Sequence, residues 1–224
     1  MDHYHLHPWN VNTVEAKHIQ RTLRERLFKG KPLALNKVKR LAAADLAFSE
    51  GKAFAVVAVF KFPSLELIEV QKASKKIAFP YVPGLLTFRE GPCLIDAFEK
   101  IKNEPDVIIF DGQGEAHPER MGIATHMGIL FDKPSIGCAK SRLIGIYKEP
   151  KKAAGSYTPL FYNEGVVGAV LRTRDGVKPL FISPGFKIDL ESSIKIVLSC
   201  CKGKRNPEPI RYVDSESKKM AKNH

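Results

Sequence analysis

Three acidic residues of the sequence stand in surroundings where a carboxylate is costly. Asp45 lies in the apolar run "AAADLAF", Asp111 directly follows the apolar run "VIIF", and Glu90 stands in "FREGP". A buried carboxylate is unfavourable unless it is paired or bound to a cation. Any one of the three could be a structural acid in a salt bridge or a helix cap. Several such acids at strand ends favour a site for a hard cation such as Mg²⁺.

A second group of functional candidates follows Asp111 and the next apolar strand. In "FDGQGEAHPERMG", Gly112 and Gly114 allow backbone amides to approach a ligand closely. His117 precedes a proline, so it is a loop residue that either positions a ligand or is a plain surface side chain. Lys140 follows a short apolar strand, and ligands bind at such strand ends in open sheets. Its ammonium either holds a scissile phosphate or is a solvated surface charge.

The string "FPYVPG", residues 79–84, predicts a stiff loop. Pro80 and Pro83 each fix φ and remove a backbone donor, so the string suits neither a central strand nor a helix interior. Such a loop holds Tyr81 outward in one orientation. A turn that merely exposes one tyrosine has the same pattern, so the stiffness alone does not assign a function.

The charge balance indicates a polyanionic partner. The 224 residues include 36 Lys and Arg against 24 Asp and Glu, which gives a formal net charge of +12. A basic protein with a hard-cation site is most simply an enzyme that acts on phosphodiester bonds, where the metal activates water and stabilises the leaving oxygen. Acyl transfer is disfavoured, since Ser183 in "ISPG" lacks the G-x-S-x-G turn of such nucleophiles.

Other sequence features point to a soluble, cytoplasmic protein without a membrane partner. The first residues lack the pattern of a signal peptide, and no apolar window approaches the roughly 20 residues of a membrane span. The four cysteines have no CxxC spacing, so we expect free thiols in a reducing compartment. We expect His3, His5 and His7 to be surface side chains of an N-terminal arm, because no further metal-ligand pair lies near them.

The apolar patterns predict one mixed-sheet α/β domain over residues 1–224, with residues 1–10 as an N-terminal arm and about 215–224 as a basic, flexible tail. A capping box at Asn12 begins a first helix, which ends near Gly30. Two turn signals then divide a long apolar stretch into three antiparallel strands. Further elements are expected after Pro92 (helix), at "DVIIF" (strand), over 123–130 (helix), over 135–139 (strand), at "GVVGAVLRT" and "KPLFISPG" (strand pair) and at "DLESSIKIVLSCC" (helix).

Taken in order, the strings "AADLAF", "FPYVPGLLTFREGP", "FDGQGEAHPERMGIATHMG" and "GCAKSRL" resemble the endonuclease V family of deoxyinosine-directed repair nucleases. The resemblance runs from about residue 9 to about residue 214, nearly the whole chain. It implies an α/β fold of the ribonuclease H-like type, in which a mixed central sheet joins an antiparallel meander to parallel strands and is flanked by helices. The strand pattern described above agrees with this fold.

The resemblance also implies roles for individual residues. Asp45, Glu90 and Asp111 correspond to the family's catalytic, metal-binding acids, and Lys140 corresponds to the catalytic lysine near the scissile phosphate. A wedge that enters the DNA where the altered base leaves it would consist of Pro80, Tyr81, Val82 and Pro83. The pocket for the hypoxanthine base would be formed by Gly84, Leu86, Gly112, Ile123 and Leu143, with His117 in a supporting role.

The reaction that the resemblance implies is hydrolysis of the second phosphodiester bond 3′ to a deoxyinosine. It would leave a 3′-hydroxyl and a 5′-phosphate and would need Mg²⁺, for which Mn²⁺ can substitute. The partner would be inosine-containing DNA, with inosine-containing RNA left open because the 2′-hydroxyl contacts that distinguish them leave no mark in the sequence. We expect a monomer and name no protein partner.

The chain departs from the family pattern at two positions. "PIRYVD" has Asp214 where a histidine near the metal is usual, and "SPGF" has Phe186 where a histidine follows the glycine. A carboxylate is a harder ligand for Mg²⁺ than an imidazole, so we expect Asp214 to bind the metal. It cannot donate a proton to the leaving group. The missing histidines leave one alternative, a non-catalytic reader of inosine-containing nucleic acid, against which the retained acids and lysine argue.

Overall fold

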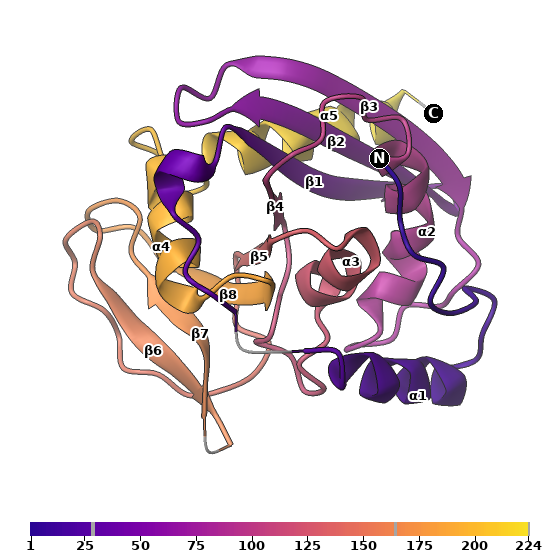
Figure 1. Cartoon of the computed structure of the whole chain (residues 1–224), viewed down its shortest axis with the longest axis horizontal. Helices are drawn as coiled ribbons and strands as arrows, with labels where there is room; N and C mark the ends of the chain where they lie inside the picture. The colour runs from indigo at the N-terminus through magenta and orange to yellow at the C-terminus, as the bar shows by residue number, and fades with distance from the viewer. Residues whose placement is uncertain (28–29, 164, 224) are drawn as a thin grey trace.

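The computed structural model describes residues 1–27, 30–163 and 165–223. In this part of the chain, eight strands form one mixed sheet in the order β3-β2-β1-β4-β5-β8-β7-β6. Helices pack on both faces of the sheet, as Figure 1 shows. The expected α/β fold is confirmed, because an antiparallel meander is joined to parallel strands within one sheet.

The meander comprises β1 (Arg40–Ser49), β2 (Lys52–Lys61) and β3 (Leu67–Lys76). β1 pairs antiparallel with β2, and β2 pairs antiparallel with β3. Both turn signals of the sequence lie between these strands, as predicted. All eight residues of β2 between its terminal lysines are buried, because helices cover both faces of the strand.

The second part of the sheet carries the strands that lead into the site. β4 (Val107–Phe110) lies parallel to β1, and β5 (Ser135–Ala139) lies parallel to β4. Every residue of both strands is buried, as expected of short apolar strands covered on both faces. The antiparallel strands β8 (Leu180–Phe186), β7 (Gly165–Leu171) and β6 (Tyr157–Tyr162) complete the sheet.

The helices divide between the two faces according to the alternation of side chains along β1. Ala42 and Ala44 pack with α2 (Leu86–Phe98) and α3 (Ile123–Phe131). Leu41 and Ala43 point to the other face, which α4 (Leu190–Ser199) and α5 (Glu208–Lys222) cover. The remaining helices are α1 (Thr13–Arg24), which packs against α3, and the short 3-10 helix η1 (Leu35–Lys37).

Several predicted boundaries are wrong. α2 begins at Leu86, so Pro92 lies inside the helix and does not precede it; the surrounding packing tolerates a proline that usually ends or kinks a helix. The predicted capping box at Asn12 is present, but α1 ends at Arg24, before the breaker signal at Gly30. The strand β6 was not predicted, because Pro159 interrupts its pattern; it is an edge strand, where proline is tolerated.

The expectation of a flexible tail from about residue 215 is wrong as far as residue 223. Most of that segment belongs to α5, which packs against β1 and β2. Ile210, Val213 and Ser217 are buried at helical spacing, and Met220 packs against the same cluster. The lysines between these positions hide the periodicity in the sequence. The last residue of the expected tail, His224, lies outside the described residues.

The N-terminal arm is docked more closely than expected. The His3 side chain is only 6% exposed, and the Nε2 atom of His7 lies 2.8 Å from Nε2 of the buried His126 on α3. Burial lowers the pKa of His7 and of His126. His5 alone of the three is exposed, so the prediction of three surface histidines is wrong for His3 and His7.

A search of the helices in the described ranges finds none that combines the length and the apolar character needed to cross a membrane.

Candidate active site

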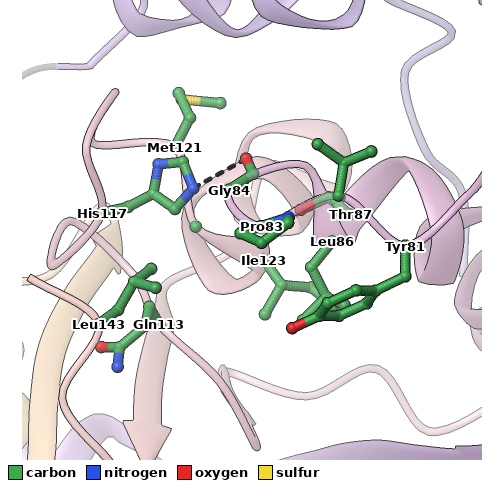
Figure 2. Close-up of a pocket in the computed structure, with 12 residues that line it drawn as sticks. Tyr81, Pro83, Gly84, Leu86, Thr87, Gln113, His117, Met121, Ile123 and Leu143 are labelled. Carbon is green, nitrogen blue, oxygen red and sulfur yellow. Dashed lines mark hydrogen bonds between the residues drawn. The ribbon is translucent and has the colours of Figure 1, made fainter. Parts of the chain in front are cut away.

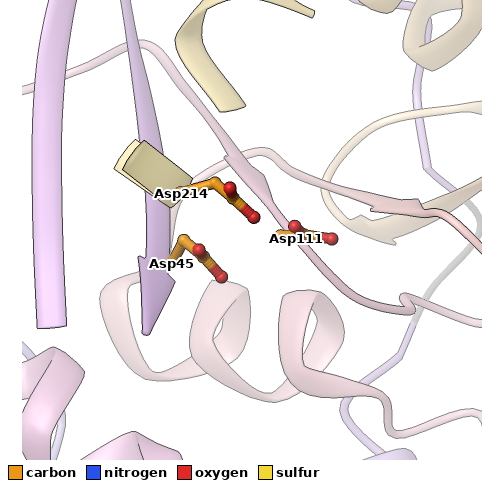
Figure 3. Close-up of side chains that lie close together, drawn as sticks. All are labelled: Asp45, Asp111 and Asp214. Atoms are coloured by element: carbon orange, nitrogen blue, oxygen red, sulfur yellow. The ribbon is translucent and has the colours of Figure 1, made fainter. Parts of the chain in front are cut away.

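Three carboxylates from separate elements meet at one end of the sheet. The side chains of Asp45, Asp111 and Asp214 offer oxygen atoms that all lie within 4.8 Å of one another. Figure 3 shows Asp45 on β1, Asp111 beyond the end of β4 and Asp214 on α5. We call this group the aspartate cluster.

Strand register explains how the cluster forms. Ala44 pairs with Phe110 across the parallel strands β1 and β4, so the residues that follow, Asp45 and Asp111, are neighbours. Ala44 and Phe110 point toward α2 and α3. Because side chains alternate along a strand, the two aspartates point to the opposite face, which α5 covers. Asp214 lies on α5 beside Val213, whose side chain is buried in that face.

Lys140 lies against the aspartate cluster, directly after β5. Its Nζ atom donates to Asp111 at 2.6 Å and to Asp214 at 2.9 Å. Burial alone would lower the pKa of Lys140, but the hydrogen bonds to these two carboxylates raise it above its ordinary value. The lysine is therefore a fixed positive charge. Its side chain remains 38% exposed, so it can also meet a ligand.

The negative charge of Asp45 is poorly compensated by the groups around it. Its pKa is raised to about 7 by burial and then by the charge of Asp111. The hydroxyl of Ser217 donates to it at 3.3 Å, a long hydrogen bond. Asp214 differs, because hydrogen bonds from Lys140 and Lys218 lower its pKa although burial alone would raise it.

The aspartate cluster fits a hard divalent cation. Three carboxylates present only oxygen donors, which Mg²⁺ and Mn²⁺ prefer. The raised pKa of Asp45 means that its charge lacks a sufficient cation partner within the protein. A divalent cation bound by Asp45, Asp111 and Asp214 would supply the missing positive charge.

Glu90 lies near the cluster but is not one of the three acids whose oxygens lie within 4.8 Å. It is buried on α2, and its pKa is raised to about 8 by burial and then by the charges of Asp45 and Asp111. The predicted acid is thus in electrostatic contact with the aspartates from the opposite side of the sheet. Its role as a metal ligand stays a prediction.

A pocket lies between the loop 79–84 and the start of α3, with a volume of about 140 Å³. This space is larger than the roughly 30 Å³ that one water occupies in the liquid. Four residues expected in the base pocket line it: Gly84, Leu86, Ile123 and Leu143 (Figure 2). The fifth, Gly112, packs behind Ile123, because a Cβ atom at Gly112 would lie 2.7 Å from Cγ2 of Ile123.

Sequence reasoning missed part of the pocket lining. Thr87, Gln113 and Met121 also line it, and Gln113 lies within the "FDGQG" string already singled out. The Gln113 amide donates to the carbonyl of Ser141 at 3.0 Å, which joins the pocket wall to the loop after Lys140. Its side-chain oxygen is buried without a hydrogen-bond partner. The sequence signal that could have identified Gln113 is its position between Gly112 and Gly114, since both glycines leave room for close backbone packing.

The residues of the expected wedge lie together at the rim of this pocket. Tyr81 is 70% exposed, and Tyr81, Val82 and Pro83 line the pocket mouth, while Pro80 is exposed beside them. Figure 2 shows the Tyr81 ring next to Leu86. The loop has no regular secondary structure, as its prolines predicted.

His117 is held as a neutral, fixed ring. Its Nε2 atom lies 2.9 Å from the carbonyl oxygen of Gly84, and Nδ1 lies 3.2 Å from the backbone N–H of Glu119. A carbonyl oxygen only accepts and a backbone N–H only donates, so the proton is on Nε2. Burial lowers the pKa of the ring, which favours this neutral form. His117 thus supports the loop and has no free nitrogen for a metal.

The two positions that depart from the family pattern have different surroundings. Asp214 is part of the aspartate cluster, whereas Phe186 is buried in an apolar cluster with Leu23 and Ile129. Ser183 is fully buried and its hydroxyl accepts the backbone N–H of Gly114 at 2.8 Å. It therefore serves the turn after β4, in agreement with its exclusion as a nucleophile.

The sheet order, with an aspartate cluster beside the middle of β1 and the end of β4, defines the class of ribonuclease H-like nucleases. Within this class, the family model for endonuclease V matches residues 21–215, and the chain belongs to the endonuclease V family. The resemblance seen in the sequence is confirmed.

Individual relatives agree with this assignment. The chain is 46% identical to an endonuclease V from Methanothrix thermoacetophila over 97% of this chain and 96% of the relative. The crystal structure of an endonuclease V from Bacillus subtilis matches with a TM-score of 0.95 and 34% identity over 100% of both chains. An endonuclease V from Ciona intestinalis, solved with a 24mer DNA containing an inosine followed by a ribo-adenosine, matches with a TM-score of 0.84 and 29% identity over 94% of this chain and 98% of that one.

Proposed function

We propose that the protein is a metal-dependent endonuclease that recognises deoxyinosine in DNA and hydrolyses the second phosphodiester bond 3′ to it. The aspartate cluster carries this proposal, because three carboxylates beside a fixed lysine suit a cation and a phosphate. Family membership supports the nuclease activity. The relative from Ciona intestinalis, bound to inosine-containing DNA, supports the substrate.

The proposed roles follow from the charges and contacts of the site. Asp45, Asp111 and Asp214 hold a divalent cation, for which Mg²⁺ is the expected ion and Mn²⁺ a substitute. When bound, such a cation activates water for attack and stabilises the leaving oxygen. Lys140 faces the phosphate with a fixed positive charge and orients it. Glu90, which is buried near Asp45 and Asp111, is the further acid of the metal site that the resemblance implies.

Recognition belongs to the pocket and its rim. Tyr81, held on a stiff loop, stacks in the gap that the altered base leaves, where an aromatic ring contributes roughly 1–3 kcal/mol. The base enters the pocket lined by Gly84, Leu86, Ile123 and Leu143. Flipping costs less for a mispaired base such as inosine than for a paired one, which adds selectivity.

The test is a cleavage assay on duplexes with and without one inosine, in Mg²⁺ and in EDTA. Metal-dependent nicks two bonds 3′ to the inosine, with 3′-hydroxyl and 5′-phosphate ends, are expected. The same assay on DNA, RNA and hybrid strands of one sequence measures whether the protein prefers deoxyribose or ribose. A shifted but intact band in Mg²⁺ would contradict the proposal and would identify a non-catalytic reader.

A further inference from the structure

We propose that Gln20 of α1 is a positioning residue for lesion recognition, because its buried amide braces the loop 79–84 against the opposite wall of the pocket. The inference rests on the proposed function and deepens it. It assigns a role to a helix that contributes no residue to the aspartate cluster or to the pocket lining.

The brace consists of two hydrogen bonds from one side chain. Gln20 is 1% exposed, and its Nε2 atom donates to the carbonyl of Gly84 at 2.9 Å and, more weakly, to that of Met121 at 3.4 Å. Because both partners are carbonyl oxygens, only the NH₂ end of the amide can face them. Gly84 ends the loop and Met121 precedes α3, so the amide joins two walls of the same pocket.

The carbonyl that Gln20 holds has a second donor. His117 donates from Nε2 to the same oxygen, as Figure 2 shows, so both acceptor positions of the Gly84 carbonyl are used. Gly84 has a φ of +83°, in the left-handed region that glycine tolerates best. The peptide between Gly84 and Leu85 also closes the turn, since the N–H of Leu85 donates to the carbonyl of Val82 at 2.9 Å.

The other end of the loop is held in a similar way. Arg89 donates from Nη1 to the carbonyl of Phe79 at 2.9 Å. The Phe79 ring is buried in a cluster with Ala16 of α1 and Phe88 of α2. The loop is thus anchored at both ends while Tyr81 between them stays 70% exposed.

This arrangement predicts an effect on selectivity rather than on general DNA affinity. Gln20 is buried and uncharged, so it cannot contact a phosphate, which is the source of affinity for any sequence. Binding of a flipped base depends on a loop and a pocket that are already in place, because ordering them on binding costs free energy. Loss of the brace should therefore weaken binding of the inosine duplex alone.

The experiment compares Gln20→Met, which keeps the side-chain length but cannot donate, with Val14→Met on the exposed side of α1. Dissociation constants in EDTA are measured for an inosine duplex and for the same duplex without inosine. Loss of one or two hydrogen bonds should weaken inosine binding about 10-fold in Gln20→Met. Binding of the undamaged duplex should change by at most about two-fold, because it depends on phosphate contacts. Val14→Met should match the wild type on both duplexes.

A second variant and a local measurement keep the inference testable if Gln20→Met is destabilised. His117→Ala removes the other donor to the Gly84 carbonyl and should also lower the selectivity for inosine. Amide hydrogen exchange of Leu85 should accelerate in Gln20→Met and in His117→Ala. Equal losses on both duplexes, or wild-type selectivity in Gln20→Met, would overturn the inference and leave the proposed function intact. A wild type without any preference for inosine would overturn both.

Discussion

The ammonium of Lys140 lies 2.6 Å from a carboxylate oxygen of Asp111. The same nitrogen lies 2.9 Å from Asp214, so one lysine pairs with two of the three acids that are expected to hold the metal. It balances part of the negative charge of the aspartate cluster and stays within reach of a phosphate bound there. We therefore expect the lysine to couple metal affinity to phosphate binding.

Replacing Lys140 should separate these two properties. Lys140→Ala removes a positive charge next to the cluster, and one unit charge at a few Å contributes on the order of 1–4 kcal/mol. We expect Mn²⁺ to bind about 10-fold more tightly to the variant, measured by calorimetry. At saturating metal, cleavage should fall about 10²-fold, because a group that stabilises developing charge is lost.

The control for this experiment is Lys133→Ala, which removes a lysine paired with Glu104 away from the cluster. It should leave metal affinity and cleavage unchanged. Weaker metal binding by Lys140→Ala would show that the lysine supports the metal site rather than competing with the cation.

The pKa of Asp45 predicts a pH-dependent difference in stability. In the folded protein this pKa is raised from 3.8 to about 7, so the protonated form is favoured by folding and its contribution is lost as the pH rises through about 7. The asparagine of Asp45→Asn does not ionise, so the variant does not lose this stability as the pH rises. Without metal, the variant should gain stability relative to the wild type as the pH rises from about 4 to about 7, and the difference should level off above that range; one pKa unit corresponds to about 1.4 kcal/mol.

Urea unfolding of both proteins in EDTA measures this difference. The matched control is Glu66→Gln, which removes one carboxylate at an exposed position. Saturating Mg²⁺ should favour the wild type over Asp45→Asn at the higher pH. A gap between wild type and Asp45→Asn that stays constant with pH would show that Asp45 is not held at a raised pKa.

Tyr81 should act on lesion binding. Tyr81→Ala removes the exposed ring from the stiff loop, and a lost stack costs roughly 1–3 kcal/mol, or about 5- to 150-fold in affinity. Gel-shift titrations in EDTA should show this loss for the inosine duplex and little change for undamaged DNA. Tyr81→Phe keeps the ring and should bind like the wild type. An equal loss on both duplexes would reject the wedge.

Asp214 should set the preference between metals. Asp214→His replaces a hard oxygen ligand by a softer nitrogen, which lowers the affinity for Mg²⁺ more than for Mn²⁺. The concentration of Mg²⁺ that gives half-maximal cleavage should rise about 10-fold, because one carboxylate charge is lost. The corresponding value for Mn²⁺ should change less. Unchanged metal requirements would show that Asp214 does not contact the cation.

The sequence predicts correctly the elements that a local residue pattern specifies. It does not predict the features that depend on tertiary packing. The apolar strands around Asp45 and Asp111 were predictable, because their residues alternate or are uniformly apolar. The docking of α5, which carries Asp214, was not predictable from the local pattern, because lysines conceal the periodicity of the helix and a helix docks only through tertiary contacts; only the family resemblance placed Asp214 near the metal. Gln20 is also invisible in the sequence, since a polar residue on a basic helix predicts a solvated side chain.

The other candidates that the sequence singled out have unequal support from the geometry. Lys140 contacts two aspartates, and His117, expected in a supporting role at the pocket, contacts the carbonyl of Gly84. Glu90 lies on α2, near Asp45 and Asp111, but it is not one of the three acids of the aspartate cluster. The register of β1 and β4 places the side chains of Asp45 and Asp111 on the face of the sheet that α5 covers. A single sequence does not reveal this register.

The central claim is that the aspartate cluster holds the catalytic cation, and metal-dependent nicking tests it most directly. A labelled inosine duplex is incubated with wild type and with Asp111→Asn over a range of Mg²⁺ concentrations and in EDTA. The wild type should nick only with metal, and Asp111→Asn should be slower by about 10³-fold, since metal catalysis contributes several kcal/mol, while it still binds the duplex. Nicking by the wild type in EDTA, or at the full rate by Asp111→Asn, would contradict the account.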